Sequence, residues 1–155
     1  MLGVPQVIVN VAPPGLLRRE AERALGLFRD PERAGVVLVT LPEDMPTNET
    51  LELYQALTED LMLPVAALVV NRVLAPIFEP GERDAFEALP GALPPGSPAE
   101  SLARAGRLRA LREEMQQESF DKLEAGIPRK QVRLPALFSA EFRRKETEAL
   151  SRAFD

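Results

Sequence analysis

Two continuously apolar runs, residues 35–40 and residues 65–71, dominate the hydrophobic pattern of the chain. Unbroken apolar runs, as opposed to alternating ones, are typical of strands that are covered on both faces of a parallel sheet. Between them, residues 47–61 carry three leucines at a helical spacing, with acidic residues on the other faces. This order predicts a β-α-β unit with a right-handed crossover.

The longest predicted helix covers residues 97–125 and has clear signals at both ends. Ser97 can cap it, Pro98 suits the first helical position, and Glu100 completes a capping box. Gly126 ends it. The remaining elements follow from periodicity and from Pro and Gly positions: a strand at 5–11, helices at 16–29 and 140–154, a loop at 91–98 and a short strand at 131–134.

These elements predict an α/β fold of one domain-sized unit. We expect the strands at 36–40, 65–71 and 131–134 to be parallel in one sheet with helices packed on it. Residues 1–34 form a helical lead-in, and residues 35–155 form the α/β part. Residues 4–12 have an alternative arrangement, in which they fold back as an extra strand that closes the sheet edge.

The composition excludes several classes of function. The net charge is −5, and no basic stripe suggests a nucleic-acid surface. The chain has no Cys and no His, which removes thiolate metal sites, cysteine nucleophiles and the commonest general base. No apolar run is long enough for a membrane span, and no signal peptide is evident, so we expect a cytoplasmic protein without direct membrane insertion.

A candidate ligand site lies where the predicted strands end, because open parallel sheets bind ligands beyond their carboxyl ends. Asn71 ends the second strand. Its amide has donors and an acceptor, so it can pair with N6 and N7 of adenine together. The alternative is that Asn71 caps a turn.

Four segments, in order, resemble the ArsA-type (anion-transporting, arsenical-pump) ATPase family, which also includes targeting ATPases for tail-anchored proteins. They cover about four-fifths of the chain and read VVLVTLPEDMPTNETLELYQAL, LPVAALVVNRV, LREEMQQESFDKLEAG and VRLPALFSAEFRRKETEALSRAF. The resemblance implies a partial Rossmann-like P-loop NTPase sheet, mostly parallel. It also implies roles for four residues: Asn71 reads adenine, Pro135 with Ala136 packs on the base, and Glu43 lies near the nucleotide and the dimer partner.

The chain departs from the family at the phosphate end of the site. No G-x-x-x-x-G-K-[ST] loop occurs, and both switch motifs and the paired cysteines of the family are absent. Residues 1–6 resemble sequence just after the second switch, so we expect the chain to begin inside a domain. ATP should then bind weakly or only with the missing half, Mg²⁺ binding by this chain alone is not expected, and no hydrolysis should occur without that half.

Two functions remain open at this point. The first is the adenine-side portion of an ATPase, and the alternative is a non-enzymatic interaction or regulatory module derived from the same fold. A small hydrolase with its own site is disfavoured, because the carboxylates of Glu43 and Asp44 have no evident nucleophile or base partner. Since the resemblance implies a missing central strand, we expect an open sheet edge that recruits the N-terminal half or a second copy.

Overall fold

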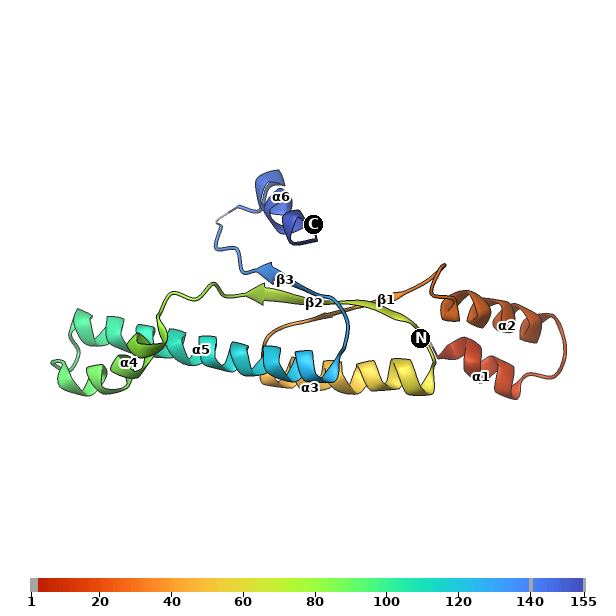
Figure 1. The fold of residues 1–155 in the computed structure, drawn as a ribbon, viewed down its shortest axis with the longest axis horizontal. Helices are drawn as coiled ribbons and strands as arrows, with labels where there is room; N and C mark the ends of the chain where they lie inside the picture. Colours follow the sequence, from red (N-terminus) through yellow and green to blue (C-terminus); the bar gives the residue numbers. More distant parts are fainter. Residues whose placement is uncertain (1–2, 140, 155) are drawn as a thin grey trace.

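The computed structural model describes residues 3–139 and 141–154, apart from the side chains of residues 80, 86–88 and 90. The chain is a mixed α/β protein in which a parallel sheet lies at the centre and helical segments extend to both sides (Figure 1). The elements are α1 (Val4–Val11), α2 (Leu16–Arg29), β1 (Val36–Thr40), α3 (Asp44–Gln55), the π-helical turn η1 (Ala56–Asp60), β2 (Val65–Val73), α4 (Pro80–Ala92), α5 (Pro98–Gly126), β3 (Gln131–Pro135), α6 (Arg144–Ser151) and the 3-10 turn η2 (Arg152–Phe154).

The sheet has the strand order β1-β2-β3, and both pairings are parallel. The predicted parallel arrangement of the three strands is therefore confirmed. Among the described residues, β1 pairs with β2 alone, so its outer edge carries unpaired backbone groups.

Helices α3 and α5 cover one face of the sheet, and the core lies between them and the strands (Figure 1). The strands contribute Leu68 and Val70, both fully buried. Helix α5 contributes Phe120 and Leu123, which are three residues apart on one side of the helix, and Ile127, the residue directly after α5, joins them in the core. Burying an aliphatic side chain of this kind contributes about 1.5–3 kcal/mol, so this contact stabilises the sheet-helix layer.

The opposite face of the sheet is covered unevenly. Val39, Val69 and Val132 are paired neighbours on β1, β2 and β3. Their exposed fractions are 64%, 5% and 4% respectively. The C-terminal turn η2 contacts β3, and α6 stands above this side of the sheet (Figure 1). The cover therefore stops before β1.

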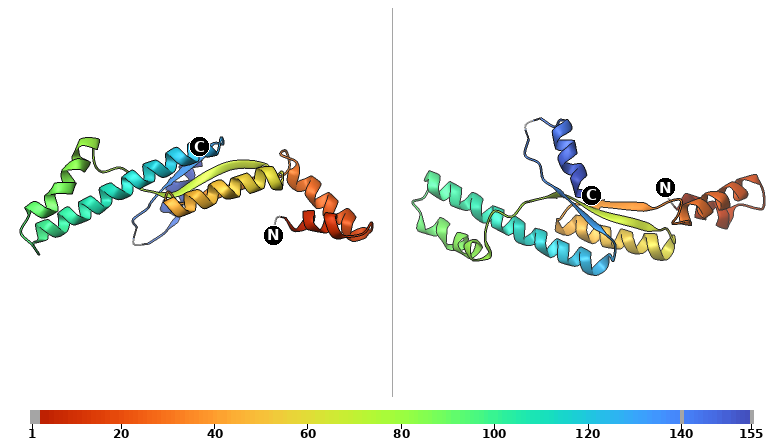
Figure 2. Two further views of the ribbon diagram at one scale, coloured as in Figure 1. Left: turned by 90° about the horizontal axis from the view of Figure 1, so that it is seen from below. Right: turned by 45° about the horizontal axis from the view of Figure 1, so that its top comes forward.

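The prediction of a strand at residues 5–11 is wrong, because these residues form helix α1. Their valines and isoleucine favour a strand by propensity, but Pro5 occupies the first turn of the helix and α1 packs against α2. The two helices form a hairpin that projects beyond the end of the sheet (Figure 2). The alternative in which residues 4–12 close the sheet edge is wrong for the same reason.

Helix α4 was missed by the sequence prediction. It begins with a reciprocal capping box between Glu79 and Glu82, and it occupies the first two positions of the predicted 91–98 loop. Helix α3 begins at Asp44, three residues earlier than predicted. The C-terminal helix is shorter than the predicted 140–154 segment, and residue 140 lies outside the described residues.

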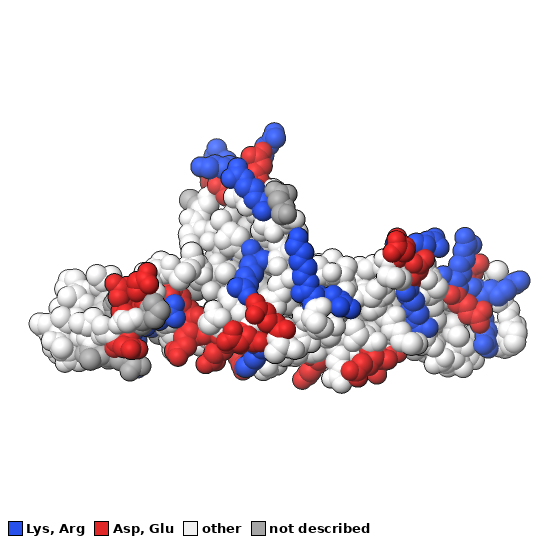
Figure 3. All heavy atoms as spheres, in the orientation of Figure 1, with Lys and Arg blue, Asp and Glu red and all other residues white. Residues whose placement is uncertain are grey.

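Charge is distributed unevenly over the surface. In Figure 3, acidic side chains gather along the side of the molecule where α3 and α5 lie, whereas basic side chains are prominent on α6 and on the α1–α2 hairpin.

In the described part of the chain, no helix combines the length and apolarity needed to cross a bilayer.

Candidate functional site

The carboxyl ends of the three strands meet at one edge of the sheet because the strands are parallel. β2 and β3 are paired at their last residues. Val73 pairs with Pro135, and the amide of Ala136 donates to the carbonyl oxygen of Val73 at 2.7 Å. The segment after β3 is therefore fixed beside the end of β2.

A β-bulge interrupts this pairing at the predicted adenine-reading residue. Asn71 and Arg72 of β2 lie opposite the single residue Leu134 of β3. Arg72 has φ of 58°, in the left-handed region. The Oδ1 atom of Asn71 accepts a hydrogen bond from the Arg72 amide at 2.8 Å. The side chain thus holds the local backbone of the bulge, and bulges of this kind re-aim side chains beside binding sites.

The other end of the Asn71 amide is available. Asn71 is half-buried, and none of the described residues accepts a hydrogen bond from its Nδ2. An amide nitrogen with both donors available can pair with an acceptor such as N7 of a purine. Asn71 therefore combines a structural bond at Oδ1 with spare donor capacity at Nδ2.

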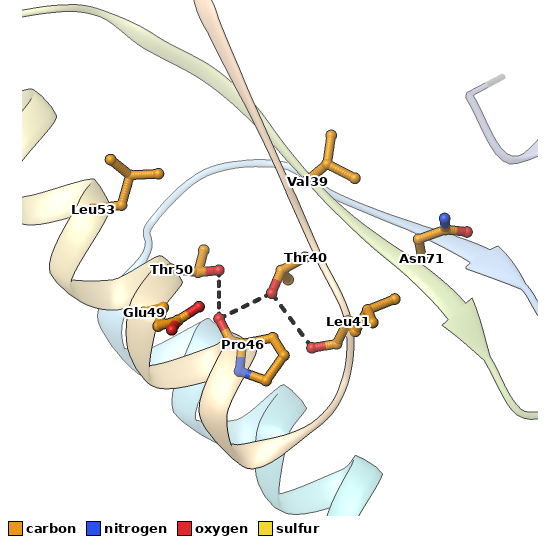
Figure 4. Close-up of a pocket in the computed structure, with 8 residues that line it drawn as sticks. All are labelled: Val39, Thr40, Leu41, Pro46, Glu49, Thr50, Leu53 and Asn71. Carbon is orange, nitrogen blue, oxygen red and sulfur yellow. Dashed lines mark hydrogen bonds between the residues drawn. The ribbon is translucent and has the colours of Figure 1, made fainter. Parts of the chain in front are cut away.

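A pocket of about 310 Å³ surrounds the end of β1 (Figure 4). Two buried threonines shape its floor: Thr40 donates to the carbonyl oxygen of Pro46 at 3.1 Å, and Thr50 donates to the same oxygen at 2.6 Å. The bond from Thr40 fixes the first turn of α3 against the strand end, whereas the bond from Thr50 lies within α3. The lining residues are Val39, Thr40, Leu41, Pro46, Glu49, Thr50, Leu53 and Asn71.

The four predicted site residues are not all brought together. Asn71 lines the pocket, whereas Pro135 and Ala136 lie on the neighbouring strand end, with Pro135 exposed and Ala136 half-buried. Glu43 is exposed, immediately precedes α3, and makes no side-chain capping bond. Of the four residues, only Asn71 lines this pocket; Pro135 and Ala136 lie at the neighbouring strand end, and Glu43 lies at the start of α3.

A buried polar cluster on α5, which the sequence analysis did not identify, holds the chain that leaves β2. Gln116 is 7% exposed and makes two hydrogen bonds to the backbone of Leu74. Its Oε1 accepts a hydrogen bond from the Leu74 amide at 2.7 Å, and its Nε2 donates one to the Leu74 carbonyl oxygen at 3.0 Å. Both polar backbone groups of Leu74 are thereby satisfied without a neighbouring strand.

Glu113, one helical turn before Gln116, is the centre of the same cluster. Its carboxylate accepts from the amide of Ile77 at 3.1 Å, from Nε of Arg109 at 2.7 Å and from Nη2 of Arg83 at 3.3 Å. Arg109 also donates to the carbonyl oxygen of Ala75. We call residues 74–77 the strap, because these bonds tie them along α5.

An exposed ion pair joins the start of α3 to α5. Nζ of Lys122 lies 2.7 Å from Oδ1 of Asp44. The hydrogen bond and the positive charge of Lys122 hold the pKa of Asp44 below its usual range. The pair is solvent-exposed and contributes orientation more than stability.

The pocket presents the amide of Asn71, the hydroxyl groups of Thr40 and Thr50, the carboxylate of Glu49 and apolar side chains. No group of three or more His, Cys, Asp or Glu residues that could hold a metal ion occurs in residues 3–139 and 141–154 as described. In comparisons with known proteins, no family model and no curated protein matches this chain.

Proposed function

We propose that the chain is the C-terminal, adenine-side portion of an ArsA-type ATPase domain that contributes to ATP binding and does not hydrolyse ATP alone. The proposal rests on the resemblance of four sequence segments and on one structural observation. Asn71 and the Pro135–Ala136 pair lie at the carboxyl ends of neighbouring parallel strands, joined by the bond from Ala136 to Val73.

This arrangement suits recognition of a purine base. Nδ2 of Asn71 supplies donors for N7, and Pro135 supplies an exposed apolar ring that can pack against the base. In the proposed fold, a partial Rossmann-like P-loop NTPase sheet, the phosphate-binding strand belongs to the missing half. The open edge of β1 is a suitable place for that strand.

The energetics predict weak nucleotide binding by the chain alone. A few hydrogen bonds to adenine contribute only about 1 kcal/mol each, so the dissociation constant should be no tighter than roughly millimolar. The missing half would supply the phosphate loop, the Mg²⁺ ligands and the positioned water that phosphoryl transfer requires.

The bond from the Arg72 amide to Oδ1 of Asn71 favours a second candidate, a non-enzymatic interaction module derived from this fold. If the only role of Asn71 is to stabilise the bulge, the conformation of the strand ends does not depend on a bound nucleotide. The strap bonds to α5 are compatible with either function, since they order the backbone and do not require a ligand.

Titration of isotope-labelled protein with millimolar AMP, followed by NMR, separates the two candidates. The proposed function predicts shifts of the Asn71 side-chain amide and the Ala136 backbone amide. Ribose 5-phosphate, which lacks the base, should leave both signals unchanged. The Asn71→Ala variant should lose the Ala136 shift, whereas Asn10→Ala, on α1, should keep it. Absence of base-dependent shifts in the folded wild-type chain would leave the interaction module as the better proposal.

A further inference from the structure

The bare side of β1 is an apolar surface without a cover in the described chain. Val37 and Val39 point to this side, with exposed fractions of 53% and 64%. β1 carries no charged residue, and its outer edge is unpaired. All-parallel sheets are almost always covered on both faces, so this side of β1 is expected to be covered in the functional protein.

Helix α1 presents a second uncovered apolar surface. Val4, Val7 and Val11 lie at spacings of three and four residues on one side of the helix, and their exposed fractions are 51%, 60% and 78%. Ile8, which borders this stripe, and Val9, on the other side of the helix, are half-buried, and α1 packs on α2. α1 contains no charged residue, and the surface over it is largely uncharged in Figure 3.

The hairpin that carries this stripe is held at its base. Arg29 of α2 donates to the carbonyl oxygen of Leu61 at 3.1 Å and to Oε1 of Gln6 on α1 at 2.7 Å. These bonds link both helices of the hairpin to the body of the protein. Because the hairpin projects beyond the sheet, α1 lies away from β1 of the same chain (Figure 2).

We propose that a second copy of this chain covers β1, with α1 of each copy lying across Val37 and Val39 of the other. The two surfaces match in chemistry, since both are apolar and neither carries a charge. α1 also fits within the length of β1, since eight helical residues span about 12 Å and five strand residues about 17 Å. A two-fold axis forms the contact twice, which enlarges the buried area toward what a stable dimer needs.

The absence of native cysteines allows a direct test by cross-linking. Val7→Cys protein and Val39→Cys protein, mixed and treated with a short bismaleimide, should give a covalent dimer. Each variant alone should give much less of it, because the two-fold places position 7 opposite position 39 and not opposite itself. Leu102→Cys on α5, which is 74% exposed, replaces either partner as the control and should give only background cross-linking.

Analytical ultracentrifugation gives an independent measurement. The wild-type chain, of 17.1 kDa, should sediment as a reversible dimer. Val39→Glu and Val7→Glu should each raise the dissociation constant at least about tenfold, because an unpaired carboxylate would be buried. Leu102→Glu should leave it unchanged, and circular dichroism should show native helix content in all three variants.

Four outcomes would overturn the proposal. The first is a wild-type monomer at high concentration, and the second is a dimer whose dissociation constant neither glutamate variant changes. The third is a dominant cross-link between two copies of the Val39→Cys protein, which indicates pairing of β1 edges. The fourth is an intramolecular cross-link in the Val7→Cys/Val39→Cys double variant. The first outcome is also the one expected if a separate partner that supplies the missing half covers β1, because the pure chain would then remain monomeric.

Discussion

Replacing Glu113 by Ala should be among the most destabilising single changes in the chain. The side chain of Glu113 is only 2% exposed and accepts hydrogen bonds from Ile77, Arg109 and Arg83. Its removal leaves the Ile77 amide and the Arg83 guanidinium without this acceptor, and Arg109 keeps only its bond to Ala75. The strap would then lose its contact at Ile77 and keep only those made by Gln116 and Arg109.

The size of the effect follows from the exposure of the partners. Breaking a buried ion pair costs about 3–5 kcal/mol when the remaining charge cannot reach water. Arg109 and Arg83 are 20% and 31% exposed, so both can be partly hydrated after the change. We therefore expect the lower end of that range, about 3 kcal/mol, for Glu113→Ala. Glu113→Gln retains an acceptor for Ile77 and should cost about 1–2 kcal/mol.

Equilibrium urea unfolding, monitored by circular dichroism, measures this difference. With an m-value of about 2 kcal/mol per molar urea, the Glu113→Ala midpoint should fall by about 1.5 M. Glu114→Ala removes an exposed carboxylate next along the same helix and should change the stability by less than about 0.5 kcal/mol. Equal midpoints for Glu113→Ala and Glu114→Ala would refute the structural role of the cluster.

Three other predictions concern backbone strain, pH and activity. Gly96 has φ of 76°, so Gly96→Ala should cost about 1 kcal/mol in thermal unfolding, whereas Gly91→Ala, in a helix with free space around it, should cost nothing; equal losses would contradict this. Asp44 has a lowered pKa, so its contribution to stability is present above its unfolded pKa and is lost as the pH falls through the folded value. Lys122→Met should raise that pKa in an NMR titration, and an unchanged value would remove Lys122 as its cause. The purified chain should show no ATP turnover above background, and turnover that Asn71→Ala abolishes would disprove this.

The sheet was predictable because its sequence signals are strong and local. The apolar runs of β1 and β2 are longer and purer than any other in the chain, and their continuity indicated burial on two faces. The uneven cover of β1 was not predictable, because an apolar run shows that cover is needed and not where it comes from. α1 was mispredicted because its short β-branched sequence satisfies strand propensity as well as a helical stripe.

The candidate site was only partly readable from the sequence. The strand-end positions of Asn71 and Pro135 followed from the predicted sheet, but the bulge that sets their register depends on backbone pairing. No signal in the sequence marks Glu113 and Gln116, because Glu and Gln on a helix are usually exposed. The sequence around these two residues does not indicate that the strap, more than thirty residues away in the chain, packs against them and buries their side chains.

The strand pairing also sets an order of assembly for the chain. Val36 pairs with Val65 across a single helix, whereas Leu68 meets Gln131 only after the whole α4–α5 excursion, roughly twice the intervening length. Closing the longer loop between β2 and β3 costs more chain entropy than closing the loop between β1 and β2. We therefore expect β1, α3 and β2 to come together first. Until β3 arrives, β2 remains an open template for other chains. Rapid dilution from denaturant should therefore produce more aggregate at high protein concentration than slow refolding does.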